Sequence, residues 1–380
     1  MKHGVKPTFF LNFAVTIPLN INKKNHIKSM KKFNTIMLAA ACMTVFATTA
    51  EAAQKRPTAK QAKQETAQMQ AALASISEDA ARAHVYFLAD DLLEGRRAGE
   101  RGSRIAKQYI ISQMRQAGVK PWLDSGYEQP FEACAEQKLK RGVRFFVNPD
   151  SIAKIKKGVY QSMALSNVLG MIPGERSDEY VVVGAHLDHE GMYPDVAGDN
   201  IYNGADDNAS GVSAVLQIMK AFAQSGAKPK RNIIFALWDG EEQGLLGSLH
   251  FTANFNDIKR IKGYINFDMV GRDNKPEDPT YMVYFYTESH PAFGAWLKDD
   301  IARYGLRLNP SYRPWDKPVG GSDNGSFAVK DVPIIWYHTD GHPDYNQPTD
   351  EADRINYPKL TDITRAAFLS AWHLANVEEY

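Results

Sequence analysis

The sequence has few cysteines, almost no net charge and no long apolar run. Its 380 residues include 2 cysteines, Cys42 and Cys134, too few for a disulfide scaffold or a zinc site made of four cysteines. The 45 Lys and Arg residues and 44 Asp and Glu residues leave a net charge of +1, without the basic excess typical of nucleic-acid binding proteins. No apolar run reaches the roughly 18 residues of a membrane-spanning helix. We therefore expect neither a nucleic-acid partner nor a membrane span.

The remaining composition is that of a globular protein. Hydrophobic residues make up 44% of the chain and charged residues 23%, which argues against a disordered or fibrous chain. A chain of 380 residues is long enough for one large domain or two medium ones. Because no Pro- or Ser-rich linker follows residue 76, we expect residues 77–380 to form a single domain.

Residues 30–52 have the pattern of a secretory signal peptide. A pair of lysines opens the segment, an apolar stretch follows over 36–47, and Ala50 and Ala52 supply an A-x-A cleavage site. This pattern predicts export, either to the periplasm or out of the cell. Residues 53–76 are rich in Ala, Gln and Lys, and we expect them to form a flexible leader that merges into the first helix.

Two features of the N-terminus leave alternatives open. Met30 is a second candidate start, which would place residues 1–29 outside the translated protein. Cys42 is a candidate lipidation site, although the apolar stretch continues past it and three alanines precede it. A lipoprotein therefore stays a minor alternative to simple export.

Apolar runs alternate with amphipathic segments along the rest of the chain. An unbroken apolar run predicts a fully buried strand over 180–185, and a second buried strand is expected over 232–238. Further strands are expected over 261–267, 281–286 and 332–337. Helical spacing predicts helices over 78–93, 101–117, 209–222, 244–254, 290–304 and 357–377. Residues 121–166 are expected to be irregular, with a strand-like piece over 143–147. The alternation predicts an α/β fold with a mixed, mostly parallel central sheet and helices on both faces.

Three predicted strands end in residue types that bind metals, at the edge where open α/β sheets hold their sites. His186 ends the first strand, and Asp188 is placed to accept the other ring N–H and fix the imidazole tautomer. Glu241 and Glu242 follow the second strand. Adjacent side chains point in different directions, so one can bind an ion while the other faces a substrate. Asp268 ends the third strand.

A fourth segment, over 203–211, opens a helix with two acids, Asp206 and Asp207, among small residues. Taken singly, all these residues are also explained by helix capping, packing or solvation. Together they would place several negative charges in one crevice, at a high cost unless cations neutralise them. A pair of divalent cations is the natural compensation, and carboxylate and imidazole ligands suit zinc.

The order of these motifs resembles the co-catalytic dizinc exopeptidases, a family that includes secreted bacterial aminopeptidases and glutamate carboxypeptidase. The motifs are His-x-Asp at 186–188, Gly-Ala-Asp-Asp-Asn-Ala-Ser-Gly at 204–211, Glu-Glu at 241–242 and Asp268. The similarity covers most of residues 80–376. It implies an α/β/α sandwich fold and two bound zinc ions.

The resemblance also implies a role for each motif residue. Asp207 would bridge the two ions. His186 and Asp268 would complete the first ion, and Glu242 would bind the second. Glu241 would be the general base toward a metal-activated water and then the acid toward the leaving amine. Asp188, through His186, is the other candidate catalytic residue.

The last ligand departs from the family pattern. That ligand is usually a histidine in a motif like Asp-Tyr-His-x-Pro-x-Asp, but residues 344–350 of this chain have Asn346 at its place. An amide oxygen binds zinc more weakly than imidazole does. His342, Asn346 or a water at an open position could each complete the second ion. We therefore expect the second zinc to be bound weakly.

A secreted aminopeptidase acting on short peptides is the function that the resemblance favours. A glutamate-type carboxypeptidase stays open, as do a glutaminyl cyclase and a non-catalytic binding protein on the same fold. The resemblance implies that the cyclases keep the last histidine, which this chain lacks. The presence of Glu241 and the other site residues argues against a binding protein. Side-chain specificity and oligomeric state stay open.

Overall fold

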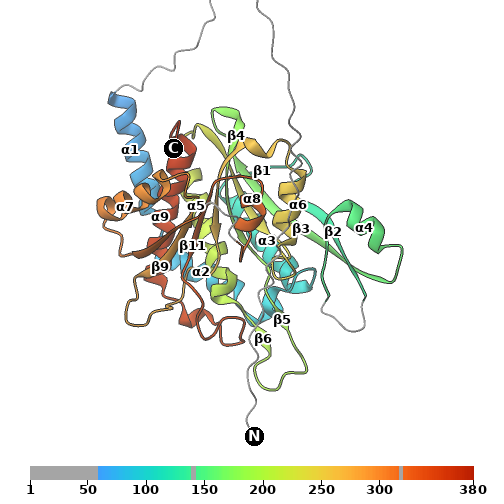
Figure 1. The fold of residues 1–380 in the computed structure, drawn as a ribbon. Helices are drawn as coiled ribbons and strands as arrows, with labels where there is room; N and C mark the ends of the chain where they lie inside the picture. Colours follow the sequence, from blue (N-terminus) through green and yellow to red (C-terminus); the bar gives the residue numbers. More distant parts are fainter. Residues whose placement is uncertain (1–58, 138–142, 316–319) are drawn as a thin grey trace, which may run out of the picture. The chain divides into compact units, whose positions relative to one another are not determined.

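Four parallel strands form the middle of the central sheet (Figure 1). The computed structural model describes residues 59–137, 143–315 and 320–380. Its middle strands, in spatial order, are β7 (Arg231–Trp238), β4 (Arg176–His186), β8 (Ile261–Phe267) and β11 (Ile334–His338). β4 pairs in parallel with both β7 and β8, and β8 with β11. The carboxyl ends of these strands therefore meet at one edge of the sheet.

Further strands extend the sheet on both sides. Next to β7 come three antiparallel strands: β3 (Tyr160–Ile172), with β1 (Lys120–Pro121) and β2 (Glu128–Glu136) paired to it. Next to β11 come β9 (Tyr281–Tyr286), which is antiparallel, and β10 (Asn309–Pro314), which is parallel to β9. A separate small pair is formed by β5 (Gly191–Met192) and β6 (Ile201–Tyr202). The predicted mixed, mostly parallel sheet is confirmed.

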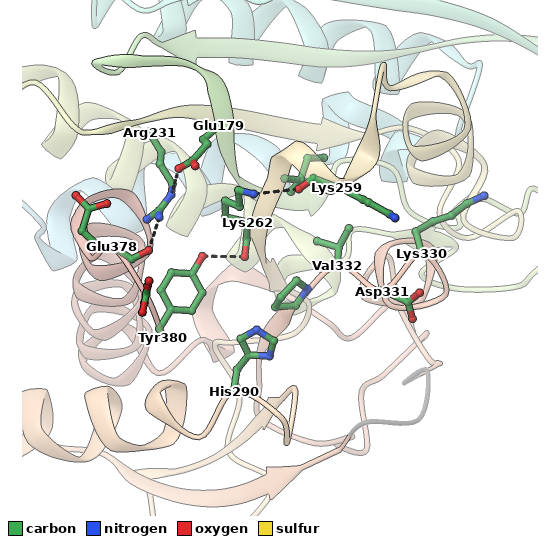
Figure 2. A pocket seen from close by; sticks show the side chains of 13 residues that line it. Glu179, Arg231, Lys259, Lys262, His290, Lys330, Asp331, Val332, Glu378 and Tyr380 are labelled. Atoms are coloured by element: carbon green, nitrogen blue, oxygen red, sulfur yellow. Dashed lines mark hydrogen bonds and ion pairs between the residues drawn. The ribbon is translucent and has the colours of Figure 1, made fainter. Parts of the chain in front are cut away.

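The amino ends of the middle strands meet at the opposite edge, around Arg231 (Figure 2). The Nε of Arg231 donates to Glu179 Oε2 at 2.7 Å. Its two terminal nitrogens donate to main-chain oxygens of Leu374, Val377 and Glu378 at 2.5–2.9 Å. A pocket of about 630 Å³ opens beside this pair. The guanidinium is buried, and protein groups satisfy all of its nitrogens.

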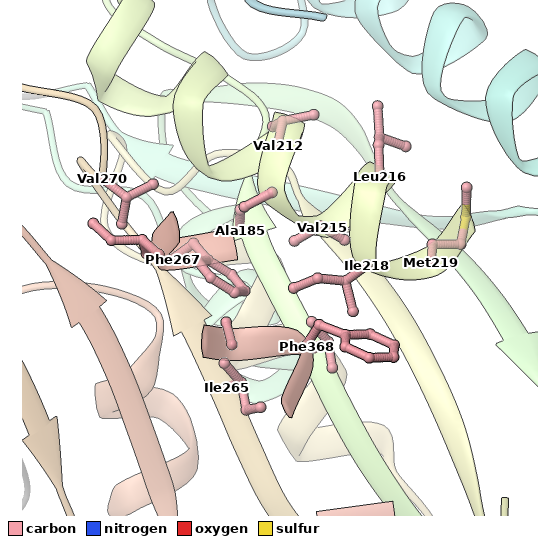
Figure 3. Packing of buried hydrophobic residues seen from close by; sticks show 14 of the residues in the cluster. Ala185, Val212, Val215, Leu216, Ile218, Met219, Ile265, Phe267, Val270 and Phe368 are labelled. Carbon is pink, nitrogen blue, oxygen red and sulfur yellow. The ribbon is translucent and has the colours of Figure 1, made fainter. Parts of the chain in front are cut away.

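Both faces of the sheet are buried, so successive strand residues enter two different cores. Val181 and Val183 of β4 pack in one core, whereas Val182 packs in the other. Figure 3 shows the first core, where Val215 and neighbouring apolar residues of helix α5 (Gly211–Ser225) pack with Ile265 of β8. Burial on both faces is the reason that residues 180–185 of β4 appear in the sequence as an unbroken apolar run.

Helices cover both faces (Figure 1). They are α1 (Ala59–Ala74), α2 (Glu78–Leu88), α3 (Arg101–Gln116), α4 (Pro149–Ile155), α5 (Gly211–Ser225), α6 (Leu246–Asn254), α7 (Ala292–Tyr304), α8 (Asn324–Ala328) and α9 (Tyr357–Asn376). α5 and α9 contact the middle strands on one face, and α6 and α8 contact strands on the other. Short helical turns are η1 (Asp91–Arg96), η2 (Ala205–Ser210), η3 (Ile258–Arg260) and η4 (Ala352–Arg354).

The ends of several helices follow local signals in the sequence. Ser77 Oγ accepts the N–H of Ala80 at 3.3 Å and caps α2. α3 ends just before Gly118, whose φ of +72° favours glycine. Asn356 Oδ1 accepts the N–H of Lys359 at 3.1 Å at the start of α9. These caps explain why the predicted starts of α2 and α9 and the predicted end of α3 lie close to the observed ones. The helix predicted over 78–93 instead ends at Leu88, before the separate turn η1.

Two expectations about irregular segments were wrong. Most of the flexible leader expected over 53–76 is helix α1, with Met69 and Leu73 buried in the main core. The irregular segment expected over 121–166 contains the long strand β2, helix α4 and the first part of β3. Polar residues interrupt the apolar pattern of β2 because much of this strand is exposed and pairs only with β3. The expected strand over 143–147 is only an isolated bridge between Cys134 and Phe146.

The predicted signal peptide, residues 30–52, and Cys42 lie outside the described residues. The described residues form one compact unit. Among the described residues, no helix combines the length and the apolar character needed to cross a membrane.

Candidate metal centre

Three predicted ligands meet at the carboxyl edge of the sheet. His186 is the last residue of β4, Asp207 lies in η2 just before α5, and Asp268 follows β8. His186 Nε2 lies 3.1 Å from Asp207 Oδ1 and 3.7 Å from Asp268 Oδ2. All three residues are buried, and their ligand atoms lie within 4.8 Å of one another. This group, called here the first cluster, has the spacing needed to bind one ion.

A second cluster shares Asp207 with the first and adds Glu242 and His189. His189 Nδ1 lies 2.8 Å from Glu242 Oε1 and 3.8 Å from Asp207 Oδ2. His189 is fully buried, and the three ligand atoms again lie within 4.8 Å of one another. The two oxygens of Asp207 therefore face different histidines, which is the arrangement expected of an acid that bridges two ions.

Glu241 lies beside both clusters. It forms a further close group with His186 and Glu242, and its backbone N–H donates to Asp188 Oδ1 at 3.1 Å. The predicted contact between the carboxylate of Asp188 and the ring of His186 is not present. His186 Nδ1 instead faces the main-chain oxygen of Asp188 at 3.1 Å, while the carboxylate Oδ1 is 4.0 Å away. The turn after β4 brings the carbonyl closer, which leaves the carboxylate free to hold Glu241.

The two residues considered for the last ligand differ in their positions. His342 lies away from both clusters, with Nε2 3.2 Å from Asp206 Oδ2. Asn346 belongs to neither cluster, although its Oδ1 is buried and has no hydrogen-bond partner among the described residues. Tyr345, the residue before Asn346, is close enough to the clusters to feel their charges. Burial and then the charges of Asp207 and Glu242 raise the pKa of Tyr345.

Arg96 holds the segments that carry these ligands. Its guanidinium is fully buried and donates to the main-chain oxygens of Leu88, Leu187, Asn203 and Gly204 at 2.5–3.0 Å. Leu187 follows the first histidine, and Gly204 precedes η2. One side chain therefore fixes two segments that are distant in the sequence.

A buried carboxylate braces η2 from the other side. Both oxygens of Asp350 accept the N–H of Asp206, at 2.9 and 3.1 Å, and Oδ2 also accepts the N–H of Asp207 at 3.1 Å. Asp350 comes from the loop that carries Asn346. The turn η2, which carries Asp207, is thus held by Arg96 on one side and by Asp350 on the other.

Burial and mutual repulsion perturb the acids of this edge. Burial raises the pKa of Glu242 and that of Asp188 to about 7. Burial and then the charges of Asp268 and Asp323 raise the pKa of Glu241 well above its usual value. Burial alone would lower the pKa of His186, but the surrounding carboxylates raise it well above its usual value. Such clustering of perturbed groups is typical of functional sites.

His189 and Arg96 were not identified as site residues from the sequence. The signal for His189 is present, because it follows Asp188 directly and makes the motif His-x-Asp-His after a buried strand. The pairing of His189 with Glu242 depends on how β4 and β7 lie side by side, and spacing alone does not reveal it. The role of Arg96 depends on four carbonyls from three segments, which no local pattern predicts.

Comparisons with known proteins agree with this geometry. Leupeptin-inactivating enzyme 1 of Streptomyces exfoliatus is 28% identical over 228 residues, which are 55% of this chain and 48% of that protein. Aminopeptidase NAALADL1 of Rattus norvegicus is 33% identical over 214 residues, or 50% of this chain and 27% of that protein. The chain therefore spans less than half the length of either relative.

A solved structure and a family model extend the likeness. The LapA aminopeptidase of Legionella pneumophila superposes with a TM-score of 0.60 at 22% identity, over 83% of this chain and 75% of that one. At this level of identity the likeness concerns the fold, and it confirms the predicted α/β/α sandwich. The model of peptidase family M28 matches residues 167–371, more than half of the chain and all residues of both clusters. The chain belongs to peptidase family M28.

Proposed function

We propose that the protein is a zinc-dependent aminopeptidase that is exported and removes N-terminal residues from peptides. The observation that carries the proposal is the pair of buried clusters that share Asp207, with the carboxylate of Glu241 beside them. Family membership and the name of one relative, an aminopeptidase, support the same conclusion.

The donor set of the clusters fits zinc. Each cluster offers one imidazole and two carboxylates, a ligand set typical of catalytic zinc with a position left for water or substrate. Two divalent cations would also remove the mutual repulsion of the acids. Burial raises the pKa of Glu242 to about 7, and the charge of Arg96, which lowers this pKa, does not outweigh burial.

The residues of the edge would then divide the work of peptide hydrolysis. When bound, the zinc ions supply Lewis-acid chemistry, which polarises the peptide carbonyl and lowers the pKa of water. Glu241 would accept the proton of the attacking water and pass it to the leaving amine. Asp188 would position Glu241 through the hydrogen bond to its backbone N–H.

Export is part of the proposal on the strength of the sequence alone. The basic pair, the apolar stretch and the A-x-A site over residues 30–52 support a cleaved signal peptide. N-terminal sequencing of the protein from the culture medium and the periplasm would identify the cleavage point.

The activity is tested with substrates that differ only in which end is free. The purified protein should release chromophore from aminoacyl p-nitroanilides but not from their N-acetylated counterparts. It should contain two zinc ions per chain by elemental analysis, and it should lose activity with 1,10-phenanthroline and regain it with zinc. A panel of aminoacyl groups is needed because the side-chain preference is open.

The same preparation separates the alternatives. Cleavage only of N-acetylated dipeptides with a free C-terminal glutamate would overturn the aminopeptidase in favour of a carboxypeptidase. Conversion of N-terminal glutamine to pyroglutamate without peptide cleavage would favour a cyclase. A protein that contains zinc but carries out none of these reactions would support a binding role.

A further inference from the structure

We propose that His189 is the histidine ligand of the second zinc ion, in place of the histidine that the family usually has at position 346. The inference rests on the proposed function, because it concerns the metal of that site. It assigns the ligand to the loop after β4 rather than to the loop that carries Asn346.

The two clusters have matching geometry around Asp207. In the first, the Nε2 of His186 lies 3.1 Å from one oxygen of Asp207 and 3.7 Å from Asp268. In the second, the Nδ1 of His189 lies 3.8 Å from the other oxygen of Asp207 and 2.8 Å from Glu242. Each ion would therefore have one imidazole, one terminal carboxylate and one oxygen of the shared acid. A second site completed by His189 needs no further protein ligand.

The backbone around His189 is built to hold its ring at this place. Its N–H donates to the main-chain oxygen of Arg96 at 3.3 Å. The ring packs on Gly204, where a Cβ would lie 2.5 Å from His189 Cδ2. Gly204 also has a φ of +57°, which favours glycine. The absence of a side chain at 204 leaves the space that the imidazole fills.

The rival residues fit the second ion less well. His342 Nε2 lies 3.2 Å from Asp206 Oδ2, and the other oxygen of Asp206 accepts the N–H of Gly271 at 2.6 Å. The imidazole of His342 therefore faces an acid that belongs to neither cluster. Asn346 offers a neutral amide oxygen, and its φ of +53° is one that asparagine adopts more readily than most residues. Because the Oδ1 of Asn346 is buried without a hydrogen-bond partner among the described residues, Asn346 is the residue against which His189 must be tested.

The metal content of the wild type and three variants tests the assignment by a readout other than activity. Zinc titration with elemental analysis should give two ions in the wild type and in Asn346→Gly, because glycine keeps the backbone conformation. His189→Ala should keep one ion and weaken the second site by more than about 100-fold. Asn346→His in the His189→Ala background should restore the second ion, since histidine tolerates a positive φ. Circular dichroism and thermal unfolding check that each variant folds.

A measurement on the unaltered protein covers the case in which His189→Ala does not fold. X-ray absorption at the zinc edge of the holoenzyme counts imidazoles per zinc. Two histidines on two ions give an average of one imidazole per zinc, whereas His186 alone gives half of that. The lower value would overturn the proposal without any variant.

The outcomes separate this inference from the proposed function. If the wild type cleaves peptides and His189→Ala retains two tightly bound ions, the assignment of His189 is wrong and the aminopeptidase stands. Loss of the second ion in Asn346→Gly, or a wild type that binds only one ion in excess zinc, would also overturn it. If the predicted zinc contents are found but no peptide is cleaved, the ligand assignment holds and the aminopeptidase fails.

Discussion

The two edges of the central sheet differ in how far protein groups compensate buried charge. At the amino edge, the guanidinium of Arg231 is satisfied by Glu179 and three main-chain oxygens. At the carboxyl edge, carboxylates lie close together, and burial raises the pKa of Glu242 to about 7. Removing one partner of a buried, fully paired charge destabilises a fold, whereas clustered charge of one sign is a place for a cationic ligand. The comparison therefore assigns structure to one edge and chemistry to the other.

Replacing a carboxylate at the carboxyl edge should have the largest effect. Glu241→Gln is expected to lower kcat for aminoacyl p-nitroanilides by about 10³-fold, or about 4 kcal/mol in the activation barrier, because the amide cannot accept a proton. Zinc content should stay at the wild-type level, since both clusters that share Asp207 keep all their members. Steady-state kinetics and elemental analysis measure the two quantities.

The matched control is the same substitution at the other edge. Glu179→Gln should leave kcat within about twofold of the wild type, because it touches Arg176 and Arg231 rather than the clusters. Near-normal turnover in Glu241→Gln would remove the general base from the proposed function. A large loss of kcat in Glu179→Gln would break the division between the edges.

Removing the cation of the amino edge should act on stability. Arg231→Gln is expected to lower the free energy of unfolding by about 3 kcal/mol, since Glu179 loses one of its two arginine donors and three carbonyls lose the guanidinium donor. The kcat of the folded variant should stay at the wild-type value. Urea unfolding measures the first quantity, and Lys259→Gln, an exposed lysine beside the same pocket, is the control with little expected effect. Equal stability of the two variants would contradict the structural role of Arg231.

The smallest expected effect depends on pH. Burial alone would raise the pKa of Glu179, but hydrogen bonds from Arg176 and Arg231 lower it below the ordinary 4.5. A carboxyl whose pKa is lower in the folded state stabilises the protein above the unfolded pKa and loses this contribution as the pH falls through the folded value. Glu179→Gln should therefore cost about 1 kcal/mol at pH 7. The difference from the wild type should shrink below pH 4.5, and a constant difference would contradict the ion pair.

The middle of the fold is predictable because its strands are buried on both faces. Residues 180–185 form an unbroken apolar run within β4, and residues 233–238 form another within β7. Strand β2 could not be predicted in this way, since alternate residues are exposed and its stability comes from pairing with β3. Helix α1 was missed for a related reason: among its residues 66–74, whose burial is described, only Met69, Ala72 and Leu73 are buried.

The site could be predicted where one residue follows one strand. His186 and Asp268 end parallel strands, so their meeting follows from topology. His189 lies three residues beyond the strand end, and its direction depends on the close approach of Gly204. His186 Nδ1 faces the main-chain oxygen of Asp188 rather than its carboxylate, and the two distances differ by about 1 Å. The sequence does not specify a difference of this size.

The hydrogen bonds of Arg96 have a consequence for how the protein binds its ions. The guanidinium joins the two ligand-bearing segments through carbonyl acceptors alone, so their arrangement does not depend on a bound cation. In many small metalloproteins, by contrast, metal binding must also order the chain. Here the protein's own hydrogen bonds already join the segments that carry the ligands. We therefore expect the protein to release and reload zinc as a folded molecule.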